Sequence, residues 1–302
     1  MKTKSNNTFH VSAPDKQVDH LSLGKLFQGF AAISLAETNK SAQMLKRFDN
    51  KYVVHREQFE RFLSLLAEDF MVLEINGIRQ FSYSSCYFDD NHRCYLDHLQ
   101  GKRHRFKVRT REYVDSGTMY FEVKLKGLRG QTDKHRISTT TFAPETVTGK
   151  SLDLLTRVYE ERYQTLFAYQ LTPELVVDYK RCTLVAKQGG ERVTIDFSLC
   201  FTSFQNLHNK IQIGDNFIII ETKSGDGKGL ADTVMKNLGV RQASKCSKYC
   251  LGVNLSGVVT QNNSFLPMIR RISENIISGD TPTGVIPAQR QARTYQSARR
   301  VK

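Results

Sequence analysis

Residues 105–126 alternate between charged and apolar side chains with a period of two, on both sides of a turn at Asp115–Gly117. The first arm places cations on one face and apolar or small side chains on the other: Arg105, Lys107, Arg109 and Arg111 against Phe106, Val108 and Thr110. The second arm opposes Glu122, Lys124 and Lys126 to Phe121, Val123 and Leu125. Such alternation predicts two antiparallel strands that bury one apolar face.

The charged face of this predicted hairpin is almost entirely positive. Like charges that lie side by side destabilise a sheet, and a sheet face that is merely solvated usually mixes the two signs. We therefore expect this face to bind a polyanion. An ordinary solvated sheet face remains the alternative interpretation.

The chain as a whole also carries an excess of positive charge. Its 302 residues include 44 lysines and arginines against 30 aspartates and glutamates, which gives a formal net charge of +14. This excess predicts an anionic partner, whether nucleic acid, an acidic membrane surface or phosphate-rich small molecules. Charge alone does not choose among them.

The sequence shows no sign of a membrane span or an export signal. No apolar run approaches the roughly 18 residues that a spanning helix needs, and the first 20 residues lack the apolar core of a signal peptide. The six cysteines form no CxxC pair and no Cys/His spacing typical of zinc. We therefore expect a cytoplasmic protein without a transmembrane segment.

Alternating segments elsewhere in the chain predict further strands at residues 47–55, 80–88, 134–141, 175–186, 191–201 and 217–223. Helical apolar spacing predicts helices over residues 26–46, 57–70, 151–169 and 230–237. Together these predict an α+β fold in which about eight antiparallel strands close into a β-tunnel, with a basic lumen and helices packed on the outside. The expected organisation is a flexible tail at residues 1–25, the tunnel domain at 26–256, and a basic, disordered tail at 257–302.

Single carboxylates stand among the cations on four predicted strands, at Asp49, Glu122, Asp196 and Glu221. Carboxylates repel a nucleic-acid backbone, so no nucleic acid is expected as partner. They become useful if a divalent metal bridges them to phosphate oxygens, because Mg²⁺ and Mn²⁺ prefer oxygen ligands. We therefore expect Mn²⁺ or Mg²⁺ as cofactor. The alternative is that each acid only neutralises a neighbouring base.

Nine blocks of this sequence, in order, resemble the VTC domain of the triphosphate tunnel metalloenzyme (CYTH-like) superfamily. They are RFDNKY (47–52), YFDD…YLDH (87–98), RFKVRTREY (105–113), FEVKLK (121–126), KHR (134–136), DYKR (178–181), ERVTID (191–196), IIETK (219–223) and SKYC (247–250). Any one block is a weak signal, but nine in order are a strong one. The resemblance runs from about residue 33 to 252 and is to the free-standing kind found in bacteria.

The resemblance implies a basic tunnel in which the γ-phosphoryl group of ATP is added to a growing inorganic polyphosphate chain. It implies catalytic roles for Lys51, Arg109, Arg111, Lys124 and Arg181. Phosphate-binding roles are expected for Lys107, Lys126, Lys134, Arg136, Arg192, Lys223 and Lys248. Glu221 would hold the metal, and Glu122, Asp49 and Asp196 are further candidate ligands.

Two positions depart from the family pattern. The acid of the first block is Asp49, where many superfamily members have Glu, and FEVKLK carries a second lysine, Lys126, at an alternate position. Two other functions stay open at this point. One is a tunnel-type tripolyphosphatase or nucleoside triphosphatase, which differs in using water as acceptor. The other is a non-catalytic module that binds polyanions. The sequence predicts no oligomeric state.

Overall fold

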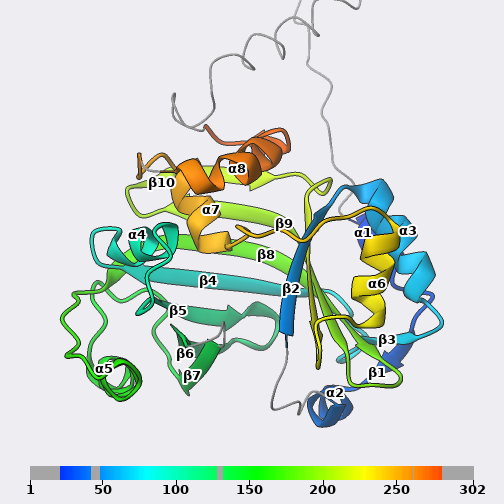
Figure 1. Ribbon diagram of the computed structural model, residues 1–302, viewed down its shortest axis with the longest axis horizontal. Helices are drawn as coiled ribbons and strands as arrows, with labels where there is room; N and C mark the ends of the chain where they lie inside the picture. The colour runs from blue at the N-terminus through cyan, green and yellow to red at the C-terminus, as the bar shows by residue number, and fades with distance from the viewer. Residues whose placement is uncertain (1–20, 42–47, 128–131, 261, 281–302) are drawn as a thin grey trace, which may run out of the picture.

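The computed structural model of the chain describes residues 21–41, 48–127, 132–260 and 262–280. One large curved sheet runs through the molecule, with helices on both of its faces (Figure 1). The strands are β1 Ala31–Ile33, β2 Phe48–Val54, β3 Phe70–Leu73, β4 Phe81–Asp89, β5 Phe106–Tyr113, β6 Thr118–Lys126, β7 Thr132–Ser138, β8 Thr172–Ala186, β9 Arg192–Ser203, β10 Asn206–Ile213, β11 Ile218–Ser224 and β12 Ile276–Ser278. The helices are α1 Leu21–Lys25, α2 Leu35–Ser41, α3 Arg56–Leu66, α4 Arg93–Leu99, α5 Gly149–Tyr163, α6 Leu230–Asn237, α7 Lys248–Leu255 and α8 Leu266–Ser273.

Eight of the strands form a continuous antiparallel path in the order β7-β6-β5-β4-β8-β9-β11-β2. The long strands β8 and β9 branch this path, because β8 also pairs with β3 and β9 also pairs with β10. The short β1 runs parallel to β3, and β12 adds to β10. The prediction of an α+β fold with an antiparallel sheet is confirmed, apart from the parallel β1–β3 pair.

The hairpin of residues 105–126 forms as its alternation predicts. Arg109 lies opposite Glu122, and Lys107 lies opposite Lys124. The turn is a short 3₁₀ segment, Val114–Ser116, followed by Gly117 with a φ of 63°, a left-handed conformation that glycine adopts without steric cost. The register therefore sends the cations of both strands and Glu122 to one face of the sheet.

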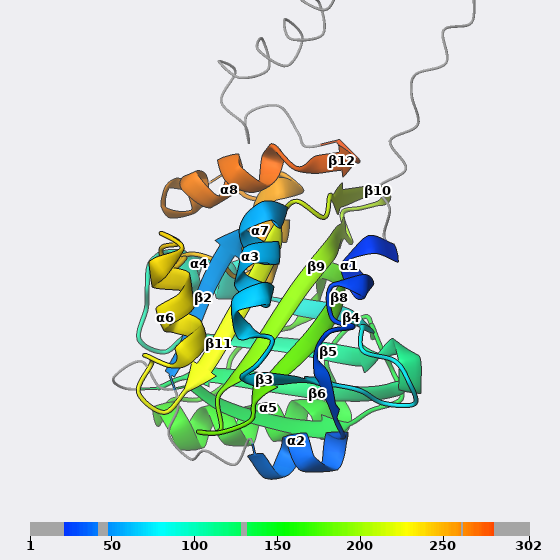
Figure 2. The same cartoon turned by 90° about the vertical axis from the view of Figure 1, so that its right-hand side faces the viewer.

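Helices cover the convex face of the sheet, where the apolar side chains of the strands point. Helix α5 packs over β5 and β6, placing Leu155 and Tyr159 against Phe106 and its neighbours. Helices α3 and α6 lie side by side over β2, β11 and β9 (Figure 2). Here Phe59 and Phe62 of α3 are fully buried. This covering of the apolar face agrees with the sequence prediction.

The concave face divides into an apolar part and a charged part, and this differs from the expected basic lumen. Helix α7 packs on β8 and β9 inside the curve of the sheet, with α8 against it (Figure 1). Beneath it lies a core that includes Leu175, Val177, Phe201 and Ile219. The register shift beside Ser198, whose φ is 51°, turns the second half of β9 so that Phe201 faces this core. The charged side chains occupy the remainder of the concave face.

Closure of the sheet into a tunnel is not confirmed. Within the described ranges, β2 pairs only with β11 and β7 pairs only with β6, so these two strands are the free edges of a half-barrel. The edge strand β2 nevertheless approaches β6 across the concave face. Burial, Arg105 and Lys107 lower the pKa of Lys126 on β6, whereas Asp49 on β2 acts to raise it.

Three further predictions are wrong, at least in part. Residues 26–46 do not form one helix, because Ala31–Ile33 pairs with β3 and α2 begins only at Leu35. The expected disordered tail does not begin at residue 257, because α8 and β12 follow and Ile269 and Ile272 are fully buried in the core beneath α7. Residues 21–25 of the predicted first tail form α1 instead, and Leu23 is fully buried there. The rest of the predicted tails, residues 1–20 and 281–302, lies outside the described residues, as do residues 42–46 of the expected helix. None of the helices in the described ranges has the length and apolarity needed to cross a membrane.

Candidate active site on the concave face

The structure places all the candidate site residues on the charged part of the concave face. Residues that lie opposite each other in a sheet point to the same side, and the register joins Lys107, Lys124 and Lys134 in one row and Arg109, Glu122 and Arg136 in the next. Across the sheet, Glu221 lies opposite Lys51, and Lys223 lies opposite Asp49 and Arg192. Arg181 lies opposite Asp196. Lys248, the first residue of α7, lies beside Arg181 and Asp196.

Glu122 is enclosed by two cations on the neighbouring strands. Nη2 and Nε of Arg109 donate to Oε2 of Glu122 at 2.6 and 2.8 Å, and the ammonium group of Lys134 pairs with Oε1. Burial alone would raise the pKa of Glu122, but Arg109, Arg111 and Lys134 hold it well below its usual range. Glu122 is therefore a fixed anion that orients Arg109, which also donates to the phenolic oxygen of Tyr87 at 2.9 Å.

Asp196 is held in the same way. Arg181 makes two parallel hydrogen bonds to its carboxylate, Nε to Oδ1 at 2.5 Å and Nη2 to Oδ2 at 2.7 Å. Lys248 pairs with Oδ2 as well, which ties the start of α7 to the sheet. Burial would raise the pKa of Asp196, but Arg181 and Lys248 hold it below its usual range. Two-point contacts of this kind fix the plane of the guanidinium group.

Glu221 stands in a more open position between two lysines. Its carboxylate pairs with Lys51 through one oxygen and with Lys223 through the other. Lys223 also reaches Oδ2 of Asp49 at 3.0 Å, so one ammonium group joins the two carboxylates. The side chains of Glu221 and Asp49 are 21% and 41% exposed, whereas those of Glu122 and Asp196 are at most 3% exposed. This pair is the part of the site that remains accessible to ions from solvent.

Arg111 and Lys124 are cations without a carboxylate partner among the described residues. Arg111 is only 6% exposed, and its guanidinium group has one hydrogen bond, from Nε to Oγ of Ser85 at 3.3 Å. Lys124 is half-buried and makes no ion pair with any residue in the described ranges. Arg109, burial, Arg111 and Lys134 together push the pKa of Lys124 well below its usual value. A buried charge that lacks a counter-charge costs several kcal/mol, and a bound anion would remove that cost.

The remaining candidate cations lie around this centre. Lys107 donates to Oγ of Ser247 at 2.8 Å, at the start of α7. The guanidinium carbon of Arg136 lies 4.6 Å from the ring centre of Tyr120. Lys126 and Arg192 extend the positive surface along β6 and β9. The site is therefore broad, with cations from seven strands and one helix around four carboxylates.

An aromatic wall supports these cations, and the sequence analysis missed it. Tyr83 and Tyr179 stack with ring centres 5.3 Å apart and an interplanar angle of 8°. The guanidinium groups of Arg111 and Arg181 each lie 5.3 Å from the Tyr83 ring, and Lys248 lies 4.8 Å from the Tyr179 ring. Such cation–π contacts stabilise a cation without neutralising it. A signal existed, because Tyr179 stands two positions before Arg181 and so shares its face.

The four carboxylates proposed as metal ligands do not gather at one point. Within the described residues no group of three or more His, Cys, Asp or Glu side chains is arranged to hold a metal ion. Glu122 and Asp196 do not fit the role, because both are buried and Arg and Lys occupy both oxygens of each. Glu221 also has a lysine on each oxygen, but it and Asp49 are partly exposed, so an ion from solvent can reach them. These two carboxylates fit the role better, since Mg²⁺ is commonly held by one or two carboxylates together with water and substrate phosphates.

One known protein family matches most of this chain. The family model described as "VTC domain" matches residues 46–256, which is more than two thirds of the chain. This protein belongs to the VTC domain family. No curated protein matches it.

Several solved structures resemble this VTC domain at low similarity. One is a protein from Vibrio parahaemolyticus assigned as an adenylate cyclase, with 14% identity, a TM-score of 0.39, and coverage of 69% of this chain and 99% of that one. A second is a candidate adenylyl cyclase from Hippeastrum with a dominant triphosphatase activity, with 11% identity, a TM-score of 0.38, and coverage of 68% and 94%. A third is a conserved hypothetical protein from Pyrococcus furiosus, with 13% identity, a TM-score of 0.35, and coverage of 65% and 92%.

Proposed function

We propose that this VTC domain is a polyphosphate polymerase, which transfers the γ-phosphoryl group of ATP to a growing inorganic polyphosphate chain on the concave face of the sheet. The observation that carries the proposal is the pair Arg111 and Lys124, two basic side chains that make no ion pair with a described carboxylate. They stand beside Arg109 and Lys134, whose charges Glu122 only partly offsets. This arrangement suits a ligand that carries several negative charges within a short length.

Phosphoryl transfer depends on positioning and charge neutralisation more than on covalent chemistry by the protein. Arg109, oriented by Glu122, and Arg181, oriented by Asp196, present guanidinium groups whose planes are fixed. Arg111 and Lys124 would bind the phosphates between them. Fixed donors of this kind stabilise the charge that develops on the transferred group and on the leaving diphosphate.

The attacking group in a polymerase is the terminal phosphate of the chain, which is already ionised at neutral pH. No protein base is needed, and the buried carboxylates would serve poorly as bases because their cation partners hold their pKa values low. Glu221 and Asp49 would hold Mn²⁺ or Mg²⁺. When bound, such an ion would supply charge neutralisation at the phosphate oxygens.

A tunnel-type triphosphatase is the second candidate, and Lys124 is the observation that favours it. Hydrolysis requires removal of a proton from water, and a lysine whose pKa lies well below its usual value can accept that proton. Incubation of the purified protein with ATP and Mn²⁺, followed by a gel stained for polyphosphate, separates the two functions. Stained polymer supports the polymerase. Phosphate release without polymer supports the triphosphatase, and neither product leaves only a binding module.

A further inference from the structure

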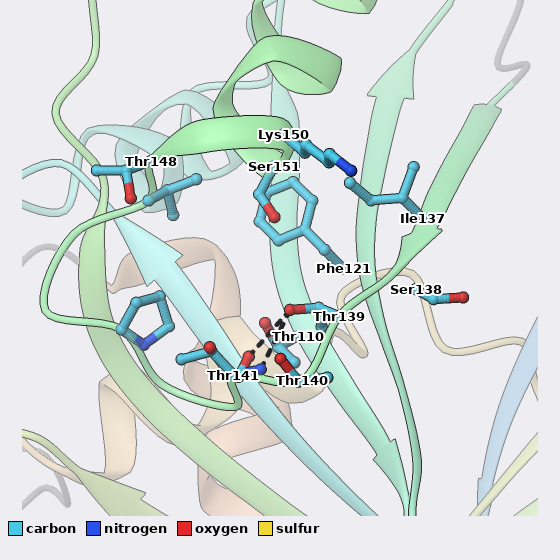
Figure 3. Close-up of a pocket in the computed structure, with 12 residues that line it drawn as sticks. Thr110, Phe121, Ile137, Ser138, Thr139, Thr140, Thr141, Thr148, Lys150 and Ser151 are labelled. Atoms are coloured by element: carbon cyan, nitrogen blue, oxygen red, sulfur yellow. Dashed lines mark hydrogen bonds between the residues drawn. The ribbon is translucent and has the colours of Figure 1, made fainter.

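A cavity of about 400 Å³ lies on the convex face of the sheet, directly behind the cationic site (Figure 3). Thr110 and Phe121 form part of its wall, and in the chain Thr110 stands between Arg109 and Arg111, while Phe121 precedes Glu122. Opposite them lie the segment after β7 and the first turn of α5. The cavity is therefore separated from the concave face by the thickness of one sheet and shares no candidate site residue with it.

Hydroxyl groups line much of this cavity. They belong to Thr110, Ser138, Thr139, Thr140, Thr141, Thr148 and Ser151, all of which are labelled in Figure 3. Thr110 is only 1% exposed, and its hydroxyl group makes no hydrogen bond with any residue of the described ranges. A ligand oxygen in the cavity would supply the partner that is missing.

The charge of the cavity is positive. Lys150 is the charged residue among those that line it, and no aspartate or glutamate does. The 15-residue helix α5 also begins here, and the side chain of its N-cap residue, Thr148, does not cap the first turn. The backbone N–H groups of the first turn of a helix are donors that favour an anion. The uncapped turn and Lys150 together make an anion the preferred ligand.

The rest of the wall is apolar. Phe121, Ile137 and Val147 face the cavity beside the hydroxyl groups. A free phosphate ion would fill only a small part of a cavity of about 400 Å³ and would leave this apolar surface without a contact. The lining thus combines an anion-binding end with a wall suited to a short carbon chain.

We propose that this cavity binds a small phosphomonoester, with the phosphate group at the first turn of α5 and Lys150, and with the carbon body against Phe121 and Ile137. The ester oxygen accepts a hydrogen bond from the Thr110 hydroxyl. The site is independent of the proposed function, because the ligand is not the substrate of the concave face.

The test is an amide NMR titration of the full chain with glycerol 3-phosphate as the probe. Saturable shifts are expected at the amides of residues 139–141 and 149–151, and they persist in the Arg111→Gln variant, whose concave site is weakened. Thr110→Val, which keeps the branched shape, and Lys150→Gln should each weaken binding about tenfold or more, equivalent to about 1.4 kcal/mol. Lys236→Gln, on the exposed end of α6, is the charge control and should bind like wild type.

The proposal is overturned if glycerol 3-phosphate shifts only amides of the concave face, or if Thr110→Val and Lys150→Gln both bind it as wild type does. Inorganic phosphate and glycerol are the two partial probes. Both should bind more weakly than the ester, and equal binding of inorganic phosphate would overturn the role of the apolar wall. All of these measurements report binding and not turnover, so their outcome is independent of the polymerase proposal.

Discussion

Lys124 on β6 and Lys134 on β7 lie directly opposite each other, yet only Lys134 has a carboxylate partner, Glu122. The pKa of Lys134 is lowered by burial to about 8, although Glu122 acts to raise it. Lys124 makes no ion pair with a described carboxylate, and Arg109, burial, Arg111 and Lys134 depress its pKa well below the usual value, although Glu122 acts to raise it. The two neighbouring lysines therefore have different roles. Lys134 helps to hold Glu122 in place, whereas Lys124 is available to bind an anionic ligand.

Binding of a polyanion should therefore raise the pKa of Lys124 and take up a proton. Calorimetric titration with tripolyphosphate, in buffers of different ionisation enthalpy, measures this uptake. Wild type should take up more protons per ligand than Lys124→Met. Lys187→Met, on the exposed loop after β8, is the matched control and should behave as wild type. Equal proton uptake by wild type and Lys124→Met would show that Lys124 is already charged in the free protein.

Substitution of Arg109 and of Arg111 should change the stability of the protein by different amounts, although both residues are proposed to bind phosphate. Arg109→Met leaves the buried carboxylate of Glu122 with Lys134 as its single partner and should lower the free energy of unfolding by about 3–5 kcal/mol. Arg111→Met removes a cation that has no carboxylate partner, so stability should stay equal or rise. Both should reduce turnover by about 10²-fold or more. Urea unfolding and turnover of the two variants check this, and equal loss of stability in both would contradict the assigned ion pairs.

Glu221 separates a metal role from a purely structural one. Glu221→Gln should abolish most metal-dependent turnover, while nucleotide still binds through the cations around it. Its effect on the melting temperature should be small, because the carboxylate is partly exposed and such ion pairs contribute about 1 kcal/mol or less. Turnover against Mn²⁺ concentration, with a melting curve alongside, measures both. A variant with the wild-type rate and metal dependence would remove the metal role.

Stability should fall as the pH rises from about 4.5 to about 7, in part because of Glu174. Burial, with help from Asp89, raises the pKa of Glu174 from 4.5 to about 7. Its unfolded form therefore loses its proton first, so the folded state loses stability through this range, by an amount on the order of 1–3 kcal/mol. Glu174→Gln should remove that part of the fall in urea unfolding measured across the range.

Two other titratable groups, Glu191 and His92, affect how this measurement is interpreted. The pKa of Glu191 is also raised by burial to about 7, so it contributes a similar fall to both proteins, and the difference between them isolates Glu174. Nδ1 of His92 lies 3.6 Å from Oε2 of Glu174. If His92→Asn flattened the profile as much as Glu174→Gln, the effect would belong to the pair rather than to the carboxyl.

The C-terminal boundary gives a further prediction. A chain that ends after Asp280 keeps α8 and β12, and it should unfold at nearly the wild-type urea concentration. A chain that ends at residue 258 loses Phe265, Ile269 and Ile272, each at most 2% exposed, and it should lose several kcal/mol. Similar stability of the two truncated proteins would contradict the packing of α8 on α7.

The strand pairs were predictable from the sequence because alternation with one buried face leaves a single register. The hairpin of β5 and β6 and the strands β8, β9 and β11 follow their predicted positions closely. The helix α8 was missed because Ser and Asn surround it, although Phe265, Ile269 and Ile272 repeat at helical spacing and Pro267 marks its first turn. The parallel pairing of Ala31–Ile33 depends on a strand far along the chain, which local spacing does not reveal.

The face on which the site residues lie was predictable, but their partners were not. A period of two assigns Arg109, Arg111 and Lys124 to one side of the sheet. Which cations form an ion pair with Glu122, and which cations have no carboxylate partner, depends on the position of β7 and on the curvature of the sheet. The distinction between the enclosed Asp196 and the accessible Glu221 follows from α7, which covers one side of the concave face.

The central claim is transfer of a phosphoryl group to a chain on the concave face, and the fate of the γ-phosphate of ATP tests it most directly. Wild-type protein is incubated with Mn²⁺, short polyphosphate primer and ATP labelled in the γ-phosphate, and the label is followed into polymer and into orthophosphate. The account predicts that the label enters polyphosphate chains longer than the primer, and that Arg111→Gln abolishes this incorporation. Label found only in orthophosphate, or incorporation that is unchanged in Arg111→Gln, would contradict it.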